Sequence, residues 1–130
     1  MAVVVDTNVI VAGAFKPSSK SGRIVVAIRK GRLRMIWNDD TRREIEYIVR
    51  KIPPLKSHRI DDLFRPENRF TGPTDPDAFA MVPDPADRKF AALAAAAGAV
   101  LITQDEHLLG VRQEIGVKVV TPGEVDHPDV

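Results

Sequence analysis

Two short apolar runs in this chain each lead into an acidic residue. Val3 to Val5 stop at Asp6, and Ile102 is followed three residues later by Asp105. Short runs rich in β-branched residues are typical of strands buried on both faces of a parallel sheet. Ligands of such sheets gather beyond the carboxyl ends of the strands, so both aspartates are candidate site residues.

The rest of the chain alternates between helix-like and strand-like patterns. This alternation indicates a parallel sheet with helices on both faces. The predicted fold class is therefore α/β, a three-layer α/β/α sandwich with a mainly parallel central sheet. We expect strands at 2–5, 33–37, 99–103 and 117–120, and helices at 21–30, 39–51, 60–64, 86–97 and 105–109.

Residues 53–85 hold seven of the ten prolines. Proline ends helices and removes a backbone donor from strands, so this segment is expected to be the least regular, with a loop at 71–77. The chain contains no linker long enough to separate two domains. We therefore expect a single domain at 1–124, followed by a short C-terminal tail at 125–130.

The composition is that of a globular domain without thiol chemistry. Of 130 residues, 44% are apolar and 28% are charged, and cysteine is absent, which excludes disulfides, thiolate zinc sites and cysteine nucleophiles. No apolar run approaches the ~18 residues of a membrane span, and the N-terminus lacks the basic segment of a secretory signal. We expect a cytoplasmic protein without membrane attachment, whose chemistry comes from oxygen and amine groups.

Charge is divided unevenly between the two halves of the chain. Residues 1–60 hold 13 Lys and Arg against 5 Asp and Glu, a net charge of +8. Residues 61–130 hold 6 against 13, a net charge of −7. The asymmetry predicts a basic surface that attracts phosphates and an acidic surface that holds cations. Solvated charges that merely coat the molecule would give the same pattern.

Two further acids, Glu44 and Asp87, stand near expected helix starts that can border the same sheet edge as Asp6 and Asp105. Four carboxylates in one crevice repel one another unless a cation is present. A ligand set made only of oxygen atoms favours Mg²⁺ or Mn²⁺. Such a site can activate water for the hydrolysis of a phosphodiester.

Helix capping offers a structural explanation for three acids. Asp84 precedes a proline at a favoured first helical position, so we expect it to cap the helix rather than to be a primary ligand. Asp87 then falls at the third helical position, where a carboxylate completes a capping box. Asp105 can likewise cap the turn that follows it.

The other acids depend on their neighbours. Glu44 shares its helix with Glu46, which we expect to face solvent, and surface glutamates are usually only solvated. Asp6 is harder to explain structurally, because an unpaired carboxylate at the end of a buried strand is costly. Thr7 and Asn8 follow it and can orient its carboxylate or bind a metal-bound water.

Several other polar residues are weaker candidates. Thr103, two residues before Asp105, can orient a carboxylate in the same way, whereas His107 is expected to be a surface residue of a short helix. Aromatic residues make up only 5% of the chain, so no base-stacking platform is evident. Three basic residues can contact an RNA backbone or can simply favour a helix dipole: Arg29, Lys30 and Arg32.

The order of short motifs along the chain closely resembles the PIN domain family. The motifs are VVDTNV at 4–9, EIE at 44–46, DPADRKF at 84–90 and LITQD at 101–105. The DTN triplet alone is a weak signal, but the four motifs in this order, over 3–124, are a specific one. The nearest resemblance is to the toxin components of VapC-like toxin–antitoxin systems.

The resemblance implies a three-layer fold and a ribonuclease activity that depends on Mg²⁺ or Mn²⁺. It also implies an RNA substrate and a cognate antitoxin protein that blocks the acidic crevice. The small residues of the helix at 86–97 can in addition support a homodimer, although they equally suit packing on the sheet. By position, the acidic quartet that binds metal and acts in catalysis is Asp6, Glu44, Asp87 and Asp105, with Asp84 auxiliary and Thr7 and Asn8 supporting.

Three other functions fit parts of the pattern. A HAD-like phosphatase needs a second acid two residues after the first, where this chain has Asn8. A receiver-like phosphoacceptor needs a lysine after a late strand, whereas Lys118 falls inside the expected last strand. A catalytically inactive binding module would keep the fold and lose the chemistry. The main prediction is a metal-dependent endoribonuclease, the toxin of a toxin–antitoxin pair.

Overall fold

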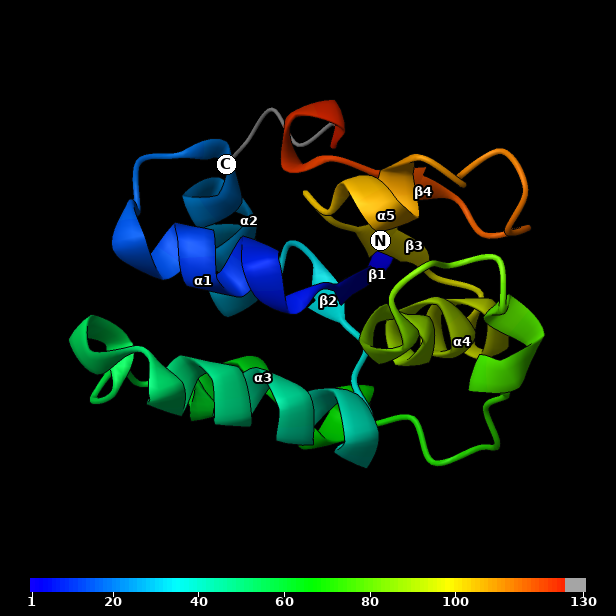
Figure 1. Ribbon diagram of the computed structural model, residues 1–130. Coiled ribbons are helices and arrows are strands. Elements are labelled where there is room, and N and C mark those ends of the chain that lie inside the picture. The colour runs from blue at the N-terminus through cyan, green and yellow to red at the C-terminus, as the bar shows by residue number, and fades with distance from the viewer. Residues whose placement is uncertain (126–130) are drawn as a thin grey trace.

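A computed structural model describes residues 1–125 of the chain (Figure 1). Four strands form one sheet in the order β2-β1-β3-β4, and each neighbouring pair is parallel. Their carboxyl ends therefore meet at one edge of the sheet. The strands are β1 (Ala2–Val5), β2 (Arg34–Met35), β3 (Val100–Ile102) and β4 (Val119–Val120).

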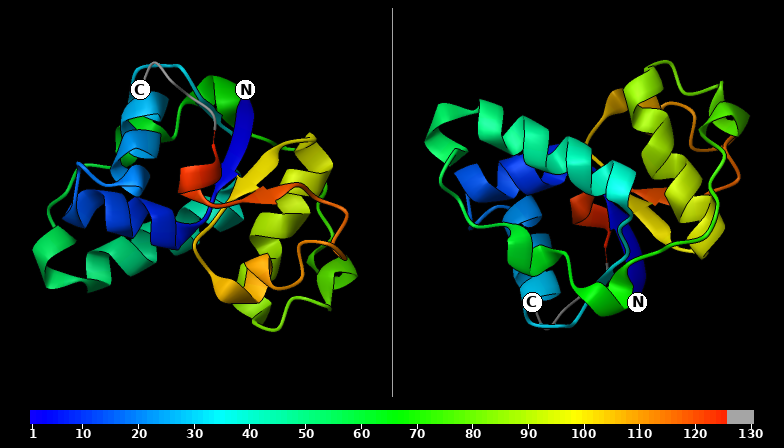
Figure 2. Two further views of the ribbon diagram at one scale, coloured as in Figure 1. Left: turned by 90° about the horizontal axis from the view of Figure 1, so that it is seen from above. Right: turned by 90° about the horizontal axis from the view of Figure 1, so that it is seen from below.

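Helices cover both faces of this sheet (Figure 2). The pair α1 (Thr7–Phe15) and α2 (Lys20–Arg29) lies on one face, and α4 (Arg88–Ala97) lies on the other. The long helix α3 (Asp39–Lys51) contacts both α1 and α4, and the short helix α5 (Glu106–Leu109) packs beside β4. The predicted three-layer α/β/α sandwich is confirmed.

The outer layers bury apolar side chains against the two central strands. In the sheet, the side chains of Val4 and Leu101 are almost wholly buried. The helices contribute buried side chains at Ile28 of α2 and at Phe90 and Leu93 of α4. Burial of each such side chain stabilises the fold by about 1.5–3 kcal/mol. The core therefore holds β1 and β3 rigidly, and these are the strands that lead to the acids.

The predicted helices at 21–30 and 39–51 are confirmed, and their ends follow from local chemistry. The Ser19 side chain caps α2 by accepting the Gly22 N–H at 3.0 Å. Asn38 and Thr41 form a reciprocal capping box at the start of α3. Gly98, at φ +63°, ends α4 in the left-handed conformation that glycine tolerates best.

No element was predicted from the sequence at residues 7–15, where the structure has α1. This segment is almost wholly apolar and contains both β-branched residues and Gly13, so it has no polar face that would reveal a helical period. Tertiary contacts decide its conformation, because Val9 and Ile10 are buried in the core. The Asp6 side chain caps the helix by accepting the Thr7 N–H.

The proline-rich segment forms a series of short 3₁₀ turns. Proline suits the first turn of a helix because its missing N–H has no partner there. The helix expected at 60–64 is a 3₁₀ turn at Asp61–Leu63. The loop expected at 71–77 ends two residues early, because a 3₁₀ turn begins at Pro76. The turns are Pro53–Leu55, Asp61–Leu63, Pro66–Asn68, Pro76–Phe79 and Pro85–Asp87, and a further one lies at Pro122–Glu124.

A bridge at Trp37 ties this segment to the sheet edge. The expected strand at 33–37 is shorter than predicted, but the Ile36 N–H still donates to the Val3 carbonyl at 2.8 Å. Beyond it, Trp37 accepts the Phe70 N–H at 2.7 Å through its backbone carbonyl. The Trp37 indole N–H donates to the Arg65 carbonyl at 2.8 Å. An irregular segment is thereby fixed without a strand of its own.

The domain limits remain a prediction. Val125, the first residue of the expected tail, is buried in the core, and residues 126–130 lie outside the described residues. Within residues 1–125, no helix is long and apolar enough to cross a membrane.

Candidate active site

Three aspartates meet at the carboxyl edge of the sheet. Asp6 follows β1, Asp105 follows β3 after a two-residue link, and Asp87 ends the 3₁₀ turn that leads into α4. One carboxylate oxygen from each lies within 4.8 Å of the others. Asp6 is 3% exposed and Asp87 is 8% exposed. Asp105 is partly exposed. Three carboxylates at this spacing, two of them buried, repel one another when ionised, so the arrangement favours a bound cation.

Three polar groups hold the Asp6 carboxylate in place. The Thr7 N–H donates to Oδ1 at 2.8 Å, and the Thr103 hydroxyl donates to Oδ2 at 2.8 Å. The Asn8 amide adds a longer bond to Oδ2 at 3.2 Å. The β1–β3 register, which pairs Val5 with Ile102, places Thr103 beside Asp6. The structure therefore gathers around Asp6 three of the four residues predicted to support the acids, all except Asp84.

Asp87 is the least satisfied of the three acids. Its Oδ2 is buried and has no hydrogen-bond partner among the described residues. Burial, a hydrogen bond with Asp105 and the charges of Asp6, Asp105 and Asp84 raise the pKa of Asp87 to about 8. An oxygen buried without a partner is costly unless a ligand reaches it.

The pKa of Asp6 is raised to about 6, chiefly by burial. The hydrogen bonds from Thr103 and Thr7 lower this pKa, and the charges of Asp105 and Glu44 raise it again. Two neighbouring carboxyl groups that resist ionisation indicate a functional site. Together with the unpartnered Asp87 oxygen, this all-oxygen donor set fits a hard divalent ion such as Mg²⁺ or Mn²⁺.

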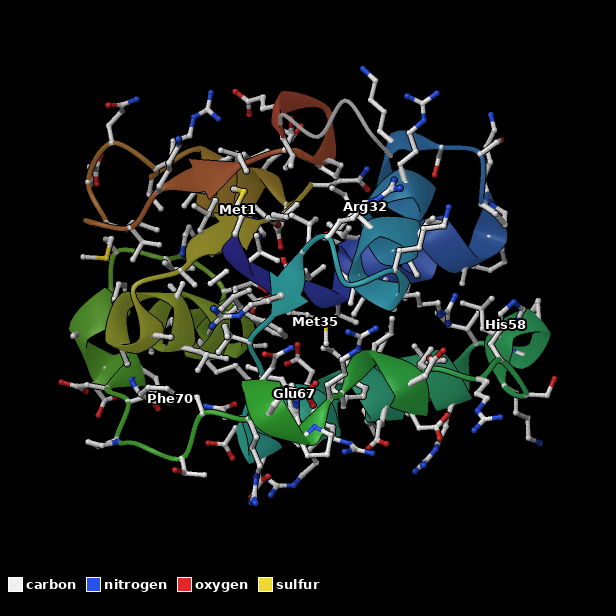
Figure 3. The ribbon with its side chains drawn as sticks, turned by 180° about the vertical axis from the view of Figure 1, so that it is seen from behind. Met1, Arg32, Met35, His58, Glu67 and Phe70 are labelled. Atoms are coloured by element: carbon white, nitrogen blue, oxygen red, sulfur yellow. The ribbon has the colours of Figure 1, made fainter. Side chains whose placement is uncertain are left out.

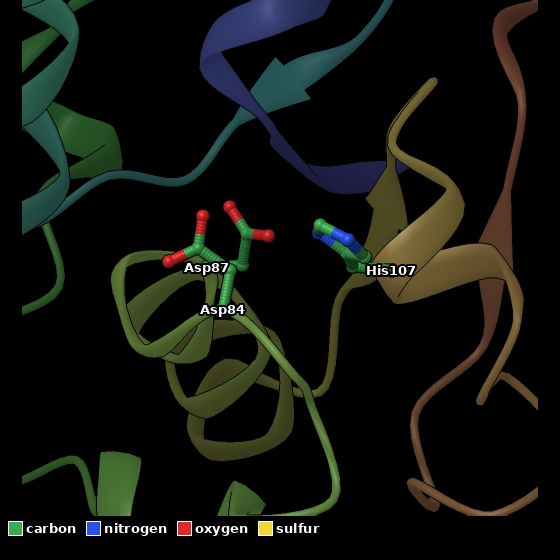
Figure 4. A group of neighbouring side chains, drawn as sticks. All are labelled: Asp84, Asp87 and His107. Atoms are coloured by element: carbon green, nitrogen blue, oxygen red, sulfur yellow. The ribbon is translucent and has the colours of Figure 1, made fainter.

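A second group joins Asp84 and His107 to Asp87 at the rim of the site (Figure 4). Asp84 accepts the Ala86 N–H at 3.0 Å, which is the capping role expected of it. The exposed His107 side chain lies with Nδ1 at 3.5 Å from Asp105 Oδ1. His107 was predicted from the sequence to be only a surface residue of a short helix. Its position two residues after Asp105, in the same helical turn, is the signal that could have placed it here.

Glu44 lies on the opposite rim and not within the group of three aspartates. Its Oε2 accepts a bond from the Thr7 hydroxyl at 3.2 Å, and its Oε1 accepts one from Lys89 Nζ at 2.9 Å. These contacts link α3 to α1 and α4. Lys89 was not singled out from the sequence, although it stands two residues after Asp87. Glu46 lines a different cavity, outside this site. It was expected to face solvent, but its side chain is only 25% exposed because it pairs with Arg42 and Arg50.

The acids open into a cavity of about 440 Å³ between α1 and α3. Its acidic end holds the three aspartates and Glu44, with Asp84 at the rim. Its other end is apolar, lined by Val11, Ile48 and Ile52 among others. The cavity therefore presents carboxylates and apolar side chains next to one another.

The three predicted phosphate-binding residues lie elsewhere. Arg29 is the last residue of α2, Lys30 caps it, and Arg32 precedes β2, so all three stand at the amino edge of the sheet, whereas the acids follow the carboxyl ends of the strands. Figure 3 shows Arg32 near the start of β2. Arg29 moreover forms an ion pair with Asp62 at 3.1 Å. The structure therefore does not bring these residues together with the acidic cluster.

Comparison with known proteins agrees with this geometry. A family model described as PIN domain matches residues 2–107, which include all four acids. The chain belongs to the PIN domain family. The resemblance read from the motifs is thereby confirmed, and membership of this family supports a nuclease function.

Other comparisons bear on the fold. No match was found among curated proteins. A solved structure titled "Structure of FitAB bound to IR36 DNA fragment" has a similar fold, with a TM-score of 0.61. The likeness covers 98% of this chain and 99% of that chain at 19% sequence identity. At this identity the match shows a shared PIN-like fold.

Proposed function

We propose that this PIN domain is a metal-dependent endoribonuclease that hydrolyses RNA phosphodiester bonds. The observation that carries the proposal is the meeting of Asp6, Asp87 and Asp105, with one carboxylate oxygen of each within 4.8 Å of the others, together with the buried Asp87 Oδ2, which has no partner among residues 1–125. These three residues would hold Mg²⁺ or Mn²⁺. A bound ion would supply positive charge beside the cleaved phosphate and the attacking water.

The remaining residues orient these groups and the substrate. Thr7, Asn8 and Thr103 fix the direction of the Asp6 carboxylate. Glu44, held by Thr7 and Lys89, lines the cavity across from the aspartates, where it can accept a hydrogen bond from water or complete the ligand set. Asp84 acts from the rim as an auxiliary acid.

We further propose that the protein is the toxin of a toxin–antitoxin pair and acts on cytoplasmic RNA. The motif resemblance to VapC-like toxins supports this role, and the shared fold with FitAB, solved with a DNA fragment, supports association with nucleic acid. A small antitoxin protein would cover the acidic crevice, and a homodimer would be the working unit. RNA contacts at Arg29, Lys30 and Arg32 would require a substrate that reaches the far edge of the sheet.

The receiver-like alternative lacks its lysine at the site. Lys118 directly precedes β4, so it lies at the amino edge of the sheet rather than beside the acids. The expected strand at 117–120 began too early, since β4 starts at Val119. The hypothesis of a phosphoacceptor domain therefore has less support than the hypothesis of a nuclease.

The test is cleavage of matched RNA and DNA strands by the pure protein with Mn²⁺, with Mg²⁺ and with a chelator. Asp6→Asn protein, purified identically, controls for contaminating nuclease. We expect metal-dependent cutting of RNA that is absent from the control. Cutting that persists in the chelator or in the Asp6→Asn protein would overturn the assignment, as would a preference for DNA.

A further inference from the structure

A second cavity adjoins the acidic site on the other side of Glu44. Its volume is about 510 Å³, within the ~300–1,000 Å³ of typical ligand sites. Glu44 lines both cavities, so the two are neighbours on either side of one side chain. The other lining residues are Asp40, Arg43, Tyr47, Pro76, Pro85 and Lys89.

The wall of this cavity is formed by an exposed aromatic ring and two prolines. Tyr47, the chain's one tyrosine, lines this cavity and is 56% exposed. Lys51, which does not line the cavity, holds its Nζ 4.3 Å from the ring centroid. The Lys51 ammonium thus covers one part of the ring, and the exposed surface of the ring is open to an apolar or aromatic group. Every nucleobase has an aromatic face, and a flat ring can stack on it.

The polar groups of the cavity suit the edge of a base better than a phosphate. Two acids and two basic residues line it, so their charges balance and leave no net attraction for an anion. Arg43 and Asp40 form a pair at 3.1 Å with side chains 74% and 62% exposed, which is weakly held. The pair offers donors and acceptors of the kind that read the edges of splayed RNA bases.

We propose that this cavity binds a nucleobase of single-stranded RNA beside the cleaved phosphate, with Tyr47 as its stacking platform. The inference rests on the proposed ribonuclease function and adds a subsite to it. The phosphate lies at the aspartates and the neighbouring base lies across Glu44. The low aromatic content of the chain does not oppose this, because one ring in one cavity is enough for one base.

The test measures binding of a short fluorescein-labelled single-stranded RNA by anisotropy in Mg²⁺. Asp6→Asn protein is the background, because that residue lies outside this cavity and its loss is expected to silence cleavage. Adding Tyr47→Ala should weaken binding about 5- to 100-fold, the usual effect of removing a stacking ring. Tyr47→Phe keeps the ring and should bind within about twofold of the background. The matched control is Phe15→Ala, which removes an equally exposed ring from the far end of α1.

A second arm locates the base. A set of RNAs is prepared, each with one abasic nucleotide at a different position. We expect one RNA of the set to bind less tightly than the unmodified RNA, and this difference to disappear in Tyr47→Ala. Circular dichroism confirms that Tyr47→Ala is folded, and light scattering reports its oligomeric state. Equal affinity with and without Tyr47, or no RNA binding by any of the variants, would overturn the subsite. So would a change from dimer to monomer without loss of RNA affinity, which would assign Tyr47 to an interface between copies of this chain.

The two proposals fail separately. Metal-dependent cleavage by the unmodified protein, together with RNA binding that is indifferent to Tyr47, would retain the nuclease and remove the subsite. RNA binding that depends on Tyr47, without any cleavage by the unmodified protein, would retain the subsite and remove the nuclease.

Discussion

The Thr103 hydroxyl donates a 2.8 Å hydrogen bond to Asp6 Oδ2 and so joins the ends of β3 and β1. Both residues are buried, at 0% and 3% exposure. The same hydroxyl oxygen accepts the Asp105 N–H at 2.9 Å. One side chain therefore sets the position of two of the three aspartates, and ligands held by such neighbours are more precisely oriented.

Replacing Thr103 tests this relationship. Thr103→Val keeps the shape, removes the bond to Asp6 and leaves the Asp105 N–H without its acceptor. We expect kcat/KM for RNA to fall about 10- to 100-fold. Stability in urea should fall by about 1–3 kcal/mol because buried polar groups lose their partner. Thr103→Ser should retain most of both quantities. Full activity of Thr103→Val would show that the hydroxyl does not position the site.

The stability of the metal-free protein should fall as the pH rises. The pKa values of Asp6 and Asp87 are raised to about 6 and about 8, whereas an unfolded aspartate titrates near 4. Between these limits the native state binds more protons than the unfolded state, so each pH unit costs up to about 1.4 kcal/mol per group. In chelator, the melting temperature should drop by several degrees between pH 5 and pH 8.

Asp87→Asn is the control for this pH dependence. The neutral amide removes the carboxyl group with the highest pKa, so the variant should melt higher than the unmodified protein at pH 8 in chelator. The loss of stability between pH 6 and pH 8 should also shrink. An unchanged slope in this variant would mean that Asp87 does not carry the effect.

Glu44 and Glu46 provide a matched pair on one helix. Glu44→Gln keeps the bond from Lys89 but removes the charge across from the aspartates, so cleavage should fall by about tenfold or more. Glu46 lies outside the site. Its Oε2 forms ion pairs with Arg42, at an N–O distance of 3.4 Å, and with Arg50, at 3.9 Å. Glu46→Gln should change cleavage very little. Equal losses of cleavage in the two variants would contradict the assignment of Glu44 to the site and of Glu46 to a surface outside it.

A backbone prediction concerns Gly98 at the end of α4. Its φ is +63°, and a Cβ added there would meet nothing within 4 Å. The cost of Gly98→Ala is therefore backbone strain alone, about 1 kcal/mol, or a fall of about 3–5 °C in the melting temperature. Gly98→Asn should cost less, because asparagine tolerates this conformation. A neutral Gly98→Ala would contradict the left-handed cap.

Sequence patterns predicted those features that depend on short stretches of chain. The apolar runs before Asp6 and Asp105 identify strands, and parallel strands bring their carboxyl ends to one edge without further information. Helix α1 escaped prediction because its segment is apolar on all sides. The resemblance to PIN domains supplied the choice of Glu44 as the fourth acid, which the local pattern left open.

Features that depend on how elements are rotated against one another could not be predicted from the local pattern of residues alone. Glu44 and Glu46 are two residues apart, and only the packing of α3 against α1 and α4 decides which of them meets Thr7. Tyr47 acquires a cavity for the same reason. Lys30 has the positive charge that could bind a phosphate, but it lies at the edge of the sheet opposite the acids. The charge pattern of the sequence does not show at which edge the end of α2 will lie.

The central claim is that Asp6, Asp87 and Asp105 hold a divalent cation, and calorimetric titration with Mn²⁺ tests it most directly. The account predicts saturable binding by the unmodified protein and a strong loss of affinity in Asp87→Asn, while Glu46→Gln binds like the unmodified protein. Equal Mn²⁺ affinity in all three proteins, or no binding by the unmodified protein, would contradict it.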